Sequence, residues 1–170
     1  MKLKNIAVVV ALLAGSVSVA QANTVTFTGS IIDAACSINP DDVDQTVNLG
    51  QISVKELASG GSSTPRNFSI RLENCDLSGL ADGTVTTKFT GAASSSVPDT
   101  LGITGDAGNA GVVITNGDGA PIELGEETAA QALQNGDNTL LYSAYLKGAA
   151  TEAAIPGQFT AVADYTLAYQ

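Results

Sequence analysis

The sequence ends in FTAVADYTLAYQ, residues 159–170, and this stretch has the two-residue period of a half-buried β-strand. One face carries the apolar or small side chains of Phe159, Ala161, Ala163, Tyr165, Leu167 and Tyr169. The opposite face carries the polar side chains of Thr160, Asp164, Thr166 and Gln170. We expect no strand to follow, so the apolar face must be covered by another part of the chain or by another molecule.

The first 22 residues are predicted to be a signal peptide. Lys2 and Lys4 supply its positive charge, residues 6–14 are apolar, and Ala20-Gln21-Ala22 has the small-x-small pattern of a cleavage site. The apolar run is shorter than the roughly 20 residues of a membrane span. We therefore expect export without a membrane span, and removing 22 of the 170 residues leaves 148, which is one ordinary domain.

The predicted mature chain begins with a second amphipathic stretch, NTVTFTGSII, residues 23–32. Its apolar or small face consists of Val25, Phe27, Gly29 and Ile31, and it contains no Lys, Arg, Glu or Pro. A glycine inside a strand weakens the strand unless another backbone approaches closely there. The two terminal strands could pair within one molecule or each complete another molecule, and periodicity alone leaves both arrangements open.

Between these ends the sequence predicts an antiparallel β-sandwich. Period-two segments alternate with clusters of Gly, Asn, Asp, Ser and Pro, which is typical of short strands joined by turns. The candidate strands are residues 25–32, 47–52, 68–72, 84–90, 112–115, 121–124, 139–146 and 159–169. Asn116-Gly117-Asp118-Gly119 indicates a hairpin turn, and residues 126–134 are predicted to form a short helical turn.

Cys36 and Cys75 are the only cysteines, and an exported chain meets an oxidising environment, so we predict a disulfide between them. Closing a loop of about 39 residues would stabilise the fold by about 3–4 kcal/mol in the chain-entropy model. Two free buried thiols are the alternative. Loss of Lys2 and Lys4 changes the net charge from −10 to −12, which disfavours nucleic acid and anionic membranes as partners.

The sequence predicts no catalytic residue, metal or cofactor. It contains no histidine, which excludes Ser-His-Asp and Cys-His catalysis and His-based metal sites. Asp41-Asp42-Val43-Asp44 and Asp118 lack the spacing of an EF-hand and are interpreted as solvated loop carboxylates. The adjacent Glu126-Glu127 pair cannot face itself across a cleft as paired general acids must.

Four stretches together resemble a known family. They are residues 26–36 (TFTGSIIDAAC), 44–51 (DQTVNLGQ) and 68–75 (FSIRLENC), and a C-terminal part in which Gly157 is fourteenth from the end and Tyr169 is penultimate. In this order, behind a signal peptide, they resemble the pilin subunits of chaperone–usher pili. The major subunits of type 1 and P-type fimbriae are the most similar, and the resemblance spans essentially the whole chain.

The resemblance implies an all-β, incomplete immunoglobulin-like sandwich that lacks its last strand and is completed by donor-strand exchange. Residues 1–22 would be the signal peptide, 23–33 the N-terminal extension and 34–170 the pilin domain. The donor face of the extension would be Val25, Phe27, Gly29 and Ile31. The acceptor groove and chaperone-binding strand would comprise Gly157, Phe159, Ala161, Ala163, Tyr165, Leu167, Tyr169 and Gln170, whose carboxylate would anchor the chaperone.

The implied partners are neighbouring pilin subunits in a homopolymer, a periplasmic chaperone, an outer-membrane usher, and tip adhesin or adaptor subunits. The implied location is a fimbrium on the surface of a Gram-negative cell, reached through the periplasm. A minor adaptor or terminator subunit is an alternative within the same class. A self-contained secreted carbohydrate-binding sandwich is an alternative from another class, and it would need a seventh strand of its own. A third alternative is an N-terminal strand that folds back into its own groove.

Overall fold

The computed structural model describes residues 23–170, so the predicted signal peptide lies outside the described residues. The chain divides after Ile32 into two units. In the described part of the first unit, residues 23–32, there is neither helix nor strand. The predicted strand 25–32 is therefore absent from the single chain, because a strand exists only where its backbone groups find a partner.

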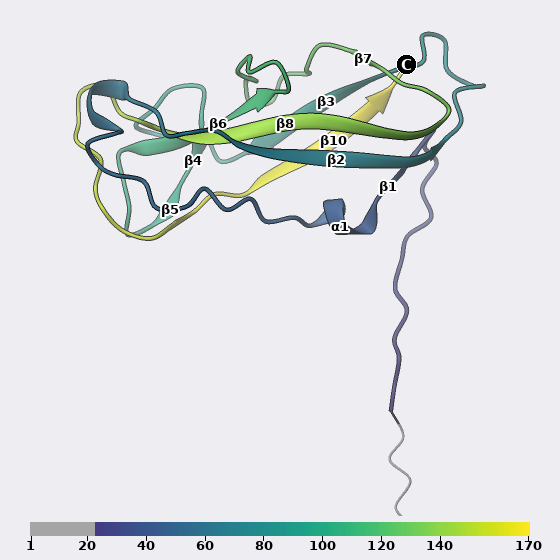
Figure 1. Cartoon of the computed structure of the whole chain (residues 1–170), viewed down its shortest axis with the longest axis horizontal. Coiled ribbons are helices and arrows are strands. Elements are labelled where there is room, and N and C mark those ends of the chain that lie inside the picture. The colour runs from purple at the N-terminus through teal and green to yellow at the C-terminus, as the bar shows by residue number, and fades with distance from the viewer. Residues whose placement is uncertain (1–22) are drawn as a thin grey trace, which may run out of the picture. The chain divides into compact units, whose positions relative to one another are not determined.

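The second unit, residues 33–170, contains ten strands, a one-turn helix and a 3₁₀ turn (Figure 1). The elements are β1 (Ser37–Ile38), α1 (Pro40–Val43), η1 (Ala58–Gly60), β2 (Arg66–Cys75), β3 (Thr84–Gly91), β4 (Leu101–Gly102), β5 (Thr104–Gly105), β6 (Ala110–Asn116), β7 (Gln131–Ala132), β8 (Gly136–Gly148), β9 (Phe159–Thr160) and β10 (Ala163–Tyr169). The regular secondary structure of the unit is therefore almost entirely β, as the sequence predicts.

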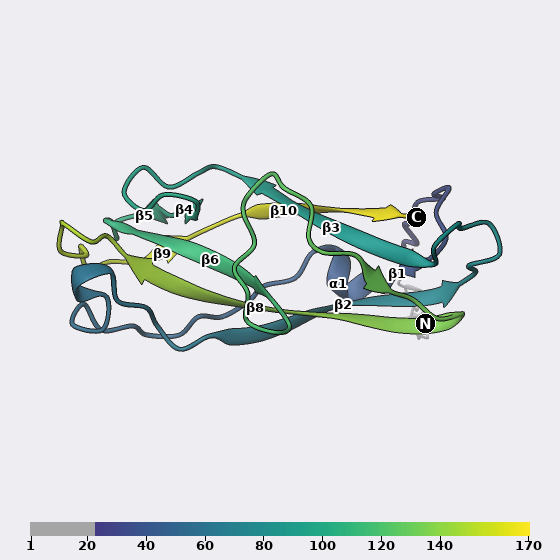
Figure 2. The same ribbon diagram turned by 90° about the horizontal axis from the view of Figure 1, so that it is seen from above.

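The strands form a five-stranded sheet in the order β1-β2-β8-β6-β4, a three-stranded sheet in the order β10-β3-β7, and the small pair β5-β9. All pairings are antiparallel. The two larger sheets face each other as the layers of a sandwich (Figures 1 and 2). Ile70 and Leu72 from β2, Phe89 from β3 and Tyr142 from β8 are buried between them.

Tyr142 is the largest fully buried side chain and is only 1% exposed. Its ring packs edge-on against Phe89, with the ring centroids 5.2 Å apart, and lies 5.5 Å from the ring of Phe68. Its hydroxyl lies 2.7 Å from the hydroxyl oxygen of Thr87, which is also fully buried. The aromatic cluster thus joins the two sheets while the buried hydroxyl groups satisfy each other.

Cys36 and Cys75 form a disulfide, as the sequence predicts. It links the chain just before β1 to the last residue of β2, and the two Cα atoms are 4.1 Å apart. The backbone N–H of Asp76 also donates to the carbonyl of Ala35 at 2.9 Å. The domain is therefore closed covalently at the point where residues 23–32 lead into it.

The long strands lie where the sequence predicts them. Residues 68–72 fall in β2, 84–90 in β3, 112–115 in β6 and 139–146 in β8. The predicted strand 159–169 is interrupted, because residues 161–162 separate β9 from β10. β9 pairs with β5 and β10 pairs with β3, so the two parts of this stretch belong to different sheets.

Three further predicted elements are wrong. Residues 47–52 form no strand, because Asn48 accepts a hydrogen bond from the N–H of Gly50, whose φ is +80°. Residues 121–124 form no strand either, because the chain crosses from one sheet to the other there. The N–H of Ile122 donates to β6, whereas the N–H of Gly125 donates to β3. In place of the helical turn at 126–134, Thr128 bonds along β3 and β7 follows.

Candidate strand-acceptor site

Within residues 23–170, β10 is paired on one edge only. It is the outermost strand of its sheet and its partner is β3, with Tyr165 opposite Phe89 and Leu167 opposite Thr87. The side chains of Ala163, Tyr165, Leu167 and Tyr169 alternate toward the core, yet each is only half-buried. A second neighbouring strand would supply the burial that this edge does not have.

The register shows which backbone groups face the free edge of β10. Gln170 and Thr84 exchange two backbone hydrogen bonds, 2.9 and 3.1 Å long. Because bonded pairs alternate in an antiparallel ladder, Ala168, Thr166 and Asp164 also bond to β3. The N–H and C=O groups of Ala163, Tyr165, Leu167 and Tyr169 therefore point away from β3, toward the free edge.

The hydrogen bonds of β3 support this assignment. The carbonyls of Phe89 and Thr87, which lie opposite Tyr165 and Leu167, accept from Gly125 and Thr128 on the far side of β3. Each distance is 2.8 Å. These carbonyls are thus unavailable to β10, as the alternation requires. The free edge of β10 is a ready template for another strand.

The other residues that the sequence assigns to this site lie just before and just after β10 in the chain. Phe159 and Ala161 are half-buried and pack on a second apolar cluster, which contains Leu101 and Leu146. A Cβ added to Gly157 would lie 2.6 Å from the backbone nitrogen of Ala107, so packing against the neighbouring loop requires glycine there. Gln170 is exposed and its backbone continues the pairing with Thr84.

Helix α1 contacts β10 through the side chain of Tyr165. Asn39 caps the helix by accepting from the N–H of Asp41 at 3.0 Å, and Pro40 occupies its first turn. The carbonyl of Asp42 accepts a hydrogen bond of 2.9 Å from the hydroxyl of Tyr165 in β10. A carbonyl in the only turn of a helix has no partner within the helix, so Tyr165 satisfies it.

The carboxylate of Asp42 is bound by Arg71 of β2. It accepts from the backbone N–H of Arg71 at 2.8 Å, from Nε at 2.8 Å and from Nη2 at 2.9 Å. Hydrogen bonds from the Arg71 side chain hold the pKa of Asp42 below its ordinary value, although burial opposes the shift. Burial raises the pKa of Tyr165, and the negative charges of Asp42 and Asp44 raise it further.

The sequence reasoning did not assign Asp42 or Arg71 to this site. Asn39 followed by Pro40 is a helix-start signal that would have located α1. No local signal indicates that α1 binds Arg71 or Tyr165, because Tyr165 is 123 residues away from Asp42 in the chain.

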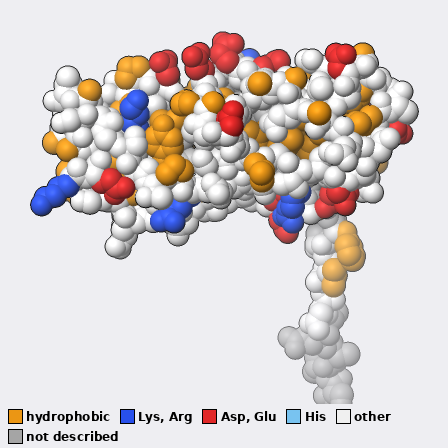
Figure 3. All heavy atoms as spheres, turned by 45° about the horizontal axis from the view of Figure 1, so that its top comes forward, with side chains coloured by type: hydrophobic (Ala, Val, Ile, Leu, Met, Phe, Trp, Pro, Cys, Tyr) orange, Lys and Arg blue, Asp and Glu red, His pale blue; other side chains and the backbone are white. Residues whose placement is uncertain are grey.

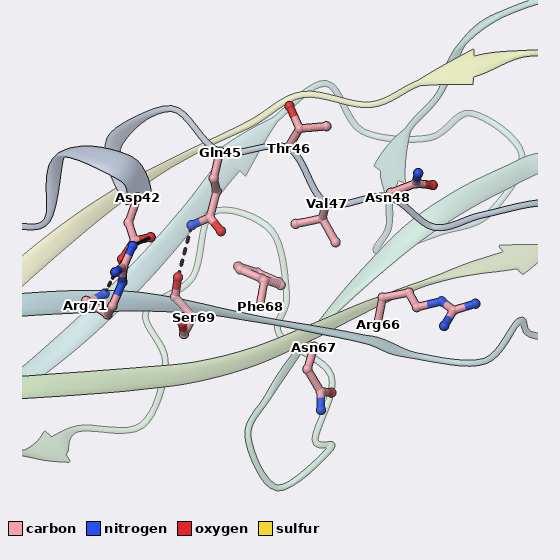
Figure 4. A pocket seen from close by; sticks show the side chains of 10 residues that line it. All are labelled: Asp42, Gln45, Thr46, Val47, Asn48, Arg66, Asn67, Phe68, Ser69 and Arg71. Atoms are coloured by element: carbon pink, nitrogen blue, oxygen red, sulfur yellow. Dashed lines mark hydrogen bonds and ion pairs between the residues drawn. The ribbon is translucent and has the colours of Figure 1, made fainter.

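A pocket of about 440 Å³ opens beside this junction, between residues 45–48 and the first half of β2 (Figure 4). Val47 and Phe68 line it from opposite sides, and Gln45 donates to the carbonyl of Ser69 at 3.2 Å. No backbone of the described chain fills this space. The edge of β2 is therefore only partly covered after β1 ends.

The extension carries the predicted donor face. The side chains of Val25, Phe27 and Ile31 are exposed. A Cβ added to Gly29 would have no atom of the described chain within 4 Å, so nothing in residues 23–170 requires glycine there. The structure therefore leaves the donor role of these residues a prediction.

Figure 3 shows mostly Asp and Glu side chains along the upper border of one face, and both acidic and basic side chains along its lower border. Among the described residues, no group of three or more His, Cys, Asp or Glu side chains is placed to hold a metal ion. No helix within residues 23–170 is long and apolar enough to cross a membrane.

Comparison with known proteins identifies the fold and the family. The model of the Fimbrial protein family matches residues 25–170. Fimbria A protein of Serratia marcescens is 52% identical, and the major MR/P fimbria protein of Proteus mirabilis is 50% identical, each over the full length of both chains. The chain belongs to the fimbrial protein family.

Solved structures agree with this assignment. The crystal structure of the P pilus rod subunit PapA is 36% identical in sequence, covers 81% of this chain and all of the other, and has a TM-score of 0.71. A subunit in the structure of a chaperone–usher pilus is also 36% identical, covers 92% of this chain and all of the other, and has a TM-score of 0.78. The predicted family, fold class and role as a structural pilin subunit are confirmed.

Proposed function

We propose that this pilin polymerises by inserting residues 23–32 of one subunit beside β10 of the next. The observation that carries this proposal is the free edge of β10. That edge offers unpaired backbone groups at four positions whose side chains are only half-buried. An added strand would gain main-chain hydrogen bonds and at the same time cover the apolar surface.

Residues 23–32 carry apolar or small side chains at alternate positions, as a strand that covers this edge must. Val25, Phe27, Gly29 and Ile31 present four alternate positions, and Ala163, Tyr165, Leu167 and Tyr169 present four on β10. Insertion would bury Phe27 and Ile31, which are 89% and 103% exposed in the single chain. Burying large apolar side chains of this kind favours association by about 1.5–3 kcal/mol each.

Each subunit carries one donor segment and one acceptor edge, so their contact is head-to-tail and gives an open fibre. The full-length relatives include a major fimbria protein, which favours the shaft of the fimbria over an adaptor or terminator position. No catalytic step and no cofactor is part of this function.

Before polymerisation the free edge needs protection, because an uncovered apolar edge pairs with any available strand. We propose that a periplasmic chaperone supplies that cover, with the carboxylate of Gln170 and the neighbouring Tyr169 as its anchor. An outer-membrane usher would then exchange the chaperone strand for residues 23–32 of the next subunit. Tip adhesin or adaptor subunits would occupy the far end of the same fibre.

The test is a pair of charge substitutions on opposite faces of the extension. Phe27→Asp places a carboxylate on the face that would be buried, and Thr26→Asp places the same charge on the other face. Burying an unpaired carboxylate is strongly unfavourable, so we expect Phe27→Asp to reduce fibre yield by about tenfold or more and Thr26→Asp to leave most of it.

Fibres are measured as oligomer ladders on gels run without boiling, and chaperone binding of each variant is measured in parallel. Both variants should bind the chaperone like the unsubstituted chain, since the chaperone would contact β10 and not the extension. Equal fibre yields from Phe27→Asp and Thr26→Asp would contradict the proposed insertion.

A further inference from the structure

Asp42 joins the two sheets across the open side of the sandwich. Its carboxylate is held by Arg71 of β2, in the five-stranded sheet, through three hydrogen bonds. Its carbonyl is held by the hydroxyl of Tyr165 of β10, in the three-stranded sheet, at 2.9 Å. We call this arrangement the Asp42 clamp, meaning Asp42 with Arg71 and Tyr165. It lies beside the free edge of β10.

The segment that follows the clamp has few other attachments. Within the described chain, residues 44–52 make no backbone-to-backbone hydrogen bond, and Gln45 alone bonds to β2, through its side chain. Leu49 and Ile52 pack on the apolar cluster around Leu101 and Leu146 and so fix the far end of the segment. The near end is fixed by α1, which is held by the clamp and by the backbone N–H of Asn39, which donates to the carbonyl of Arg71 at 2.9 Å.

The middle of this segment has room to move. The pocket of about 440 Å³ separates residues 45–48 from β2 (Figure 4). Most side chains from Asp44 to Asn48 are exposed, with Val47 half-buried. If α1 were released, close packing would not hold residues 44–48 in place, because a gap of this size removes the contacts on one side.

We propose that the Asp42 clamp positions residues 44–48 at the correct distance from β10, so that the vacant subunit is ready to receive a strand. Tyr165 and Asp42 are positioning residues in this view. The inference rests on the proposed strand insertion. It adds the contact that keeps residues 44–48 positioned while the site beside β10 is vacant. A subunit with a broken clamp spends only a fraction of its time with residues 44–48 in place, and strand binding slows by that fraction.

The clamp should affect association and not dissociation. Once a strand is inserted, it covers the free edge of β10 and holds the neighbouring segment itself, so the Tyr165 hydroxyl becomes redundant. Losing one hydrogen bond of ordinary strength should therefore slow association by about fivefold and leave the dissociation rate within about twofold of its original value.

The experiment uses the full mature chain carrying Phe27→Asp, so that its own extension is a poor donor, and a fluorescent peptide of residues 23–32. Association and dissociation rates are measured by fluorescence anisotropy for Tyr165→Phe, which removes only the hydroxyl. The matched control is Tyr145→Phe in β8. Within the described residues the Tyr145 hydroxyl makes no hydrogen bond, so both rates should be unchanged.

Asp42→Asn provides a second route to the same state, because it weakens the bonds from Arg71 while leaving the carbonyl that Tyr165 binds. It should also slow association. The double variant Asp42→Asn with Tyr165→Phe should slow association by less than the product of the two single effects, because both substitutions loosen the same attachment of α1.

Association by Tyr165→Phe as fast as that of Tyr145→Phe would overturn the clamp proposal and leave strand insertion standing. A change confined to the dissociation rate would overturn it as well, because that result would make Tyr165 an ordinary contact of the bound strand. If the subunit without clamp substitutions binds no peptide, the proposed insertion fails and the clamp proposal fails with it.

Discussion

β8 and β10 have the same kind of sequence and very different surroundings. Both alternate apolar with polar side chains, and both contribute aromatic residues to the same core. β8 is bonded to β2 on one edge and to β6 on the other, and its Leu140, Tyr142 and Leu146 are at most 4% exposed. Among the described residues 23–170, β10 is bonded to β3 alone, and its inward side chains are all half-buried.

The difference teaches that alternation determines which side chains point inward, whereas the number of neighbouring strands determines how completely they are buried. β10 has the sequence pattern of a core strand, but within the described residues it has one neighbouring strand, where β8 has two. The missing burial is therefore specific to one edge of the fold, and it can be restored from outside by one added strand.

The largest effect is expected in β8. Tyr142→Ala would remove the ring packed against Phe68 and Phe89 and leave the buried Thr87 hydroxyl without its partner. We expect a loss of about 3–5 kcal/mol in the free energy of unfolding, measured by urea denaturation of the mature chain. Tyr145→Ala, on the same strand but only half-buried, should cost about 1 kcal/mol. Equal losses would remove the distinction between the two positions.

A smaller and conditional effect is expected in β10. Leu167→Ala should cost about 1–2 kcal/mol in the vacant subunit, because the side chain is only half-buried there. With a peptide of residues 23–32 bound, the same substitution should cost about 2–5 kcal/mol, the range for a fully buried leucine. Thr166→Ala on the opposite face is the control, and its effect should be the same in both states. If Leu167→Ala lowers the stability by the same amount with and without the peptide, the peptide does not cover this edge.

The smallest effect concerns the contact between α1 and β2, and it depends on pH. Because the folded pKa of Asp42 is lower than the unfolded pKa, its carboxylate stabilises the fold above the unfolded value of about 3.9. That stabilisation is lost as the pH falls through the folded pKa. As the pH falls below about 4, the melting temperature of Asp42→Asn should therefore decrease less steeply than that of the unsubstituted chain.

Asp41→Asn is the matched control for this pH dependence. Asp41 lies 3.7 Å from the same arginine, but its side chain is 85% exposed, so solvent weakens the interaction. Its profile should stay close to that of the unsubstituted chain. If Asp42→Asn and Asp41→Asn give the same profile, the acid dependence has another source.

Much of the architecture could be predicted from local pattern. β2, β3, β6 and β8 lie over predicted strands because each keeps one face in the core, which imposes a two-residue period. Residues 126–134 were predicted wrongly for the opposite reason. Their Ala, Glu and Gln residues favour helix locally, but the bonds between Thr128 and Thr87 hold them beside β3.

The site could be predicted only in part. The inward positions of β10 follow from alternation, and so does the face of residues 23–32 that would be donated. The Asp42 clamp could not be predicted, because its three members come from α1, β2 and β10 and meet only after the two sheets have packed. The pilin resemblance implies that the C-terminal strand borders an acceptor groove, but it does not indicate the junction of Asp42 with Arg71 and Tyr165.

The disulfide has a mechanical consequence in a fibre built by strand insertion. Tension on residues 23–32 would enter the domain at Asp33 and reach Cys36 almost at once. From there the disulfide to Cys75 carries the load past residues 37–74, and the Cα atoms of the two cysteines are 4.1 Å apart. Asp42, Arg71 and residues 44–52 lie inside that bypassed loop, whereas Tyr165 lies outside it. Tension that enters a subunit through its own extension would therefore pass through the disulfide and bypass residues 37–74.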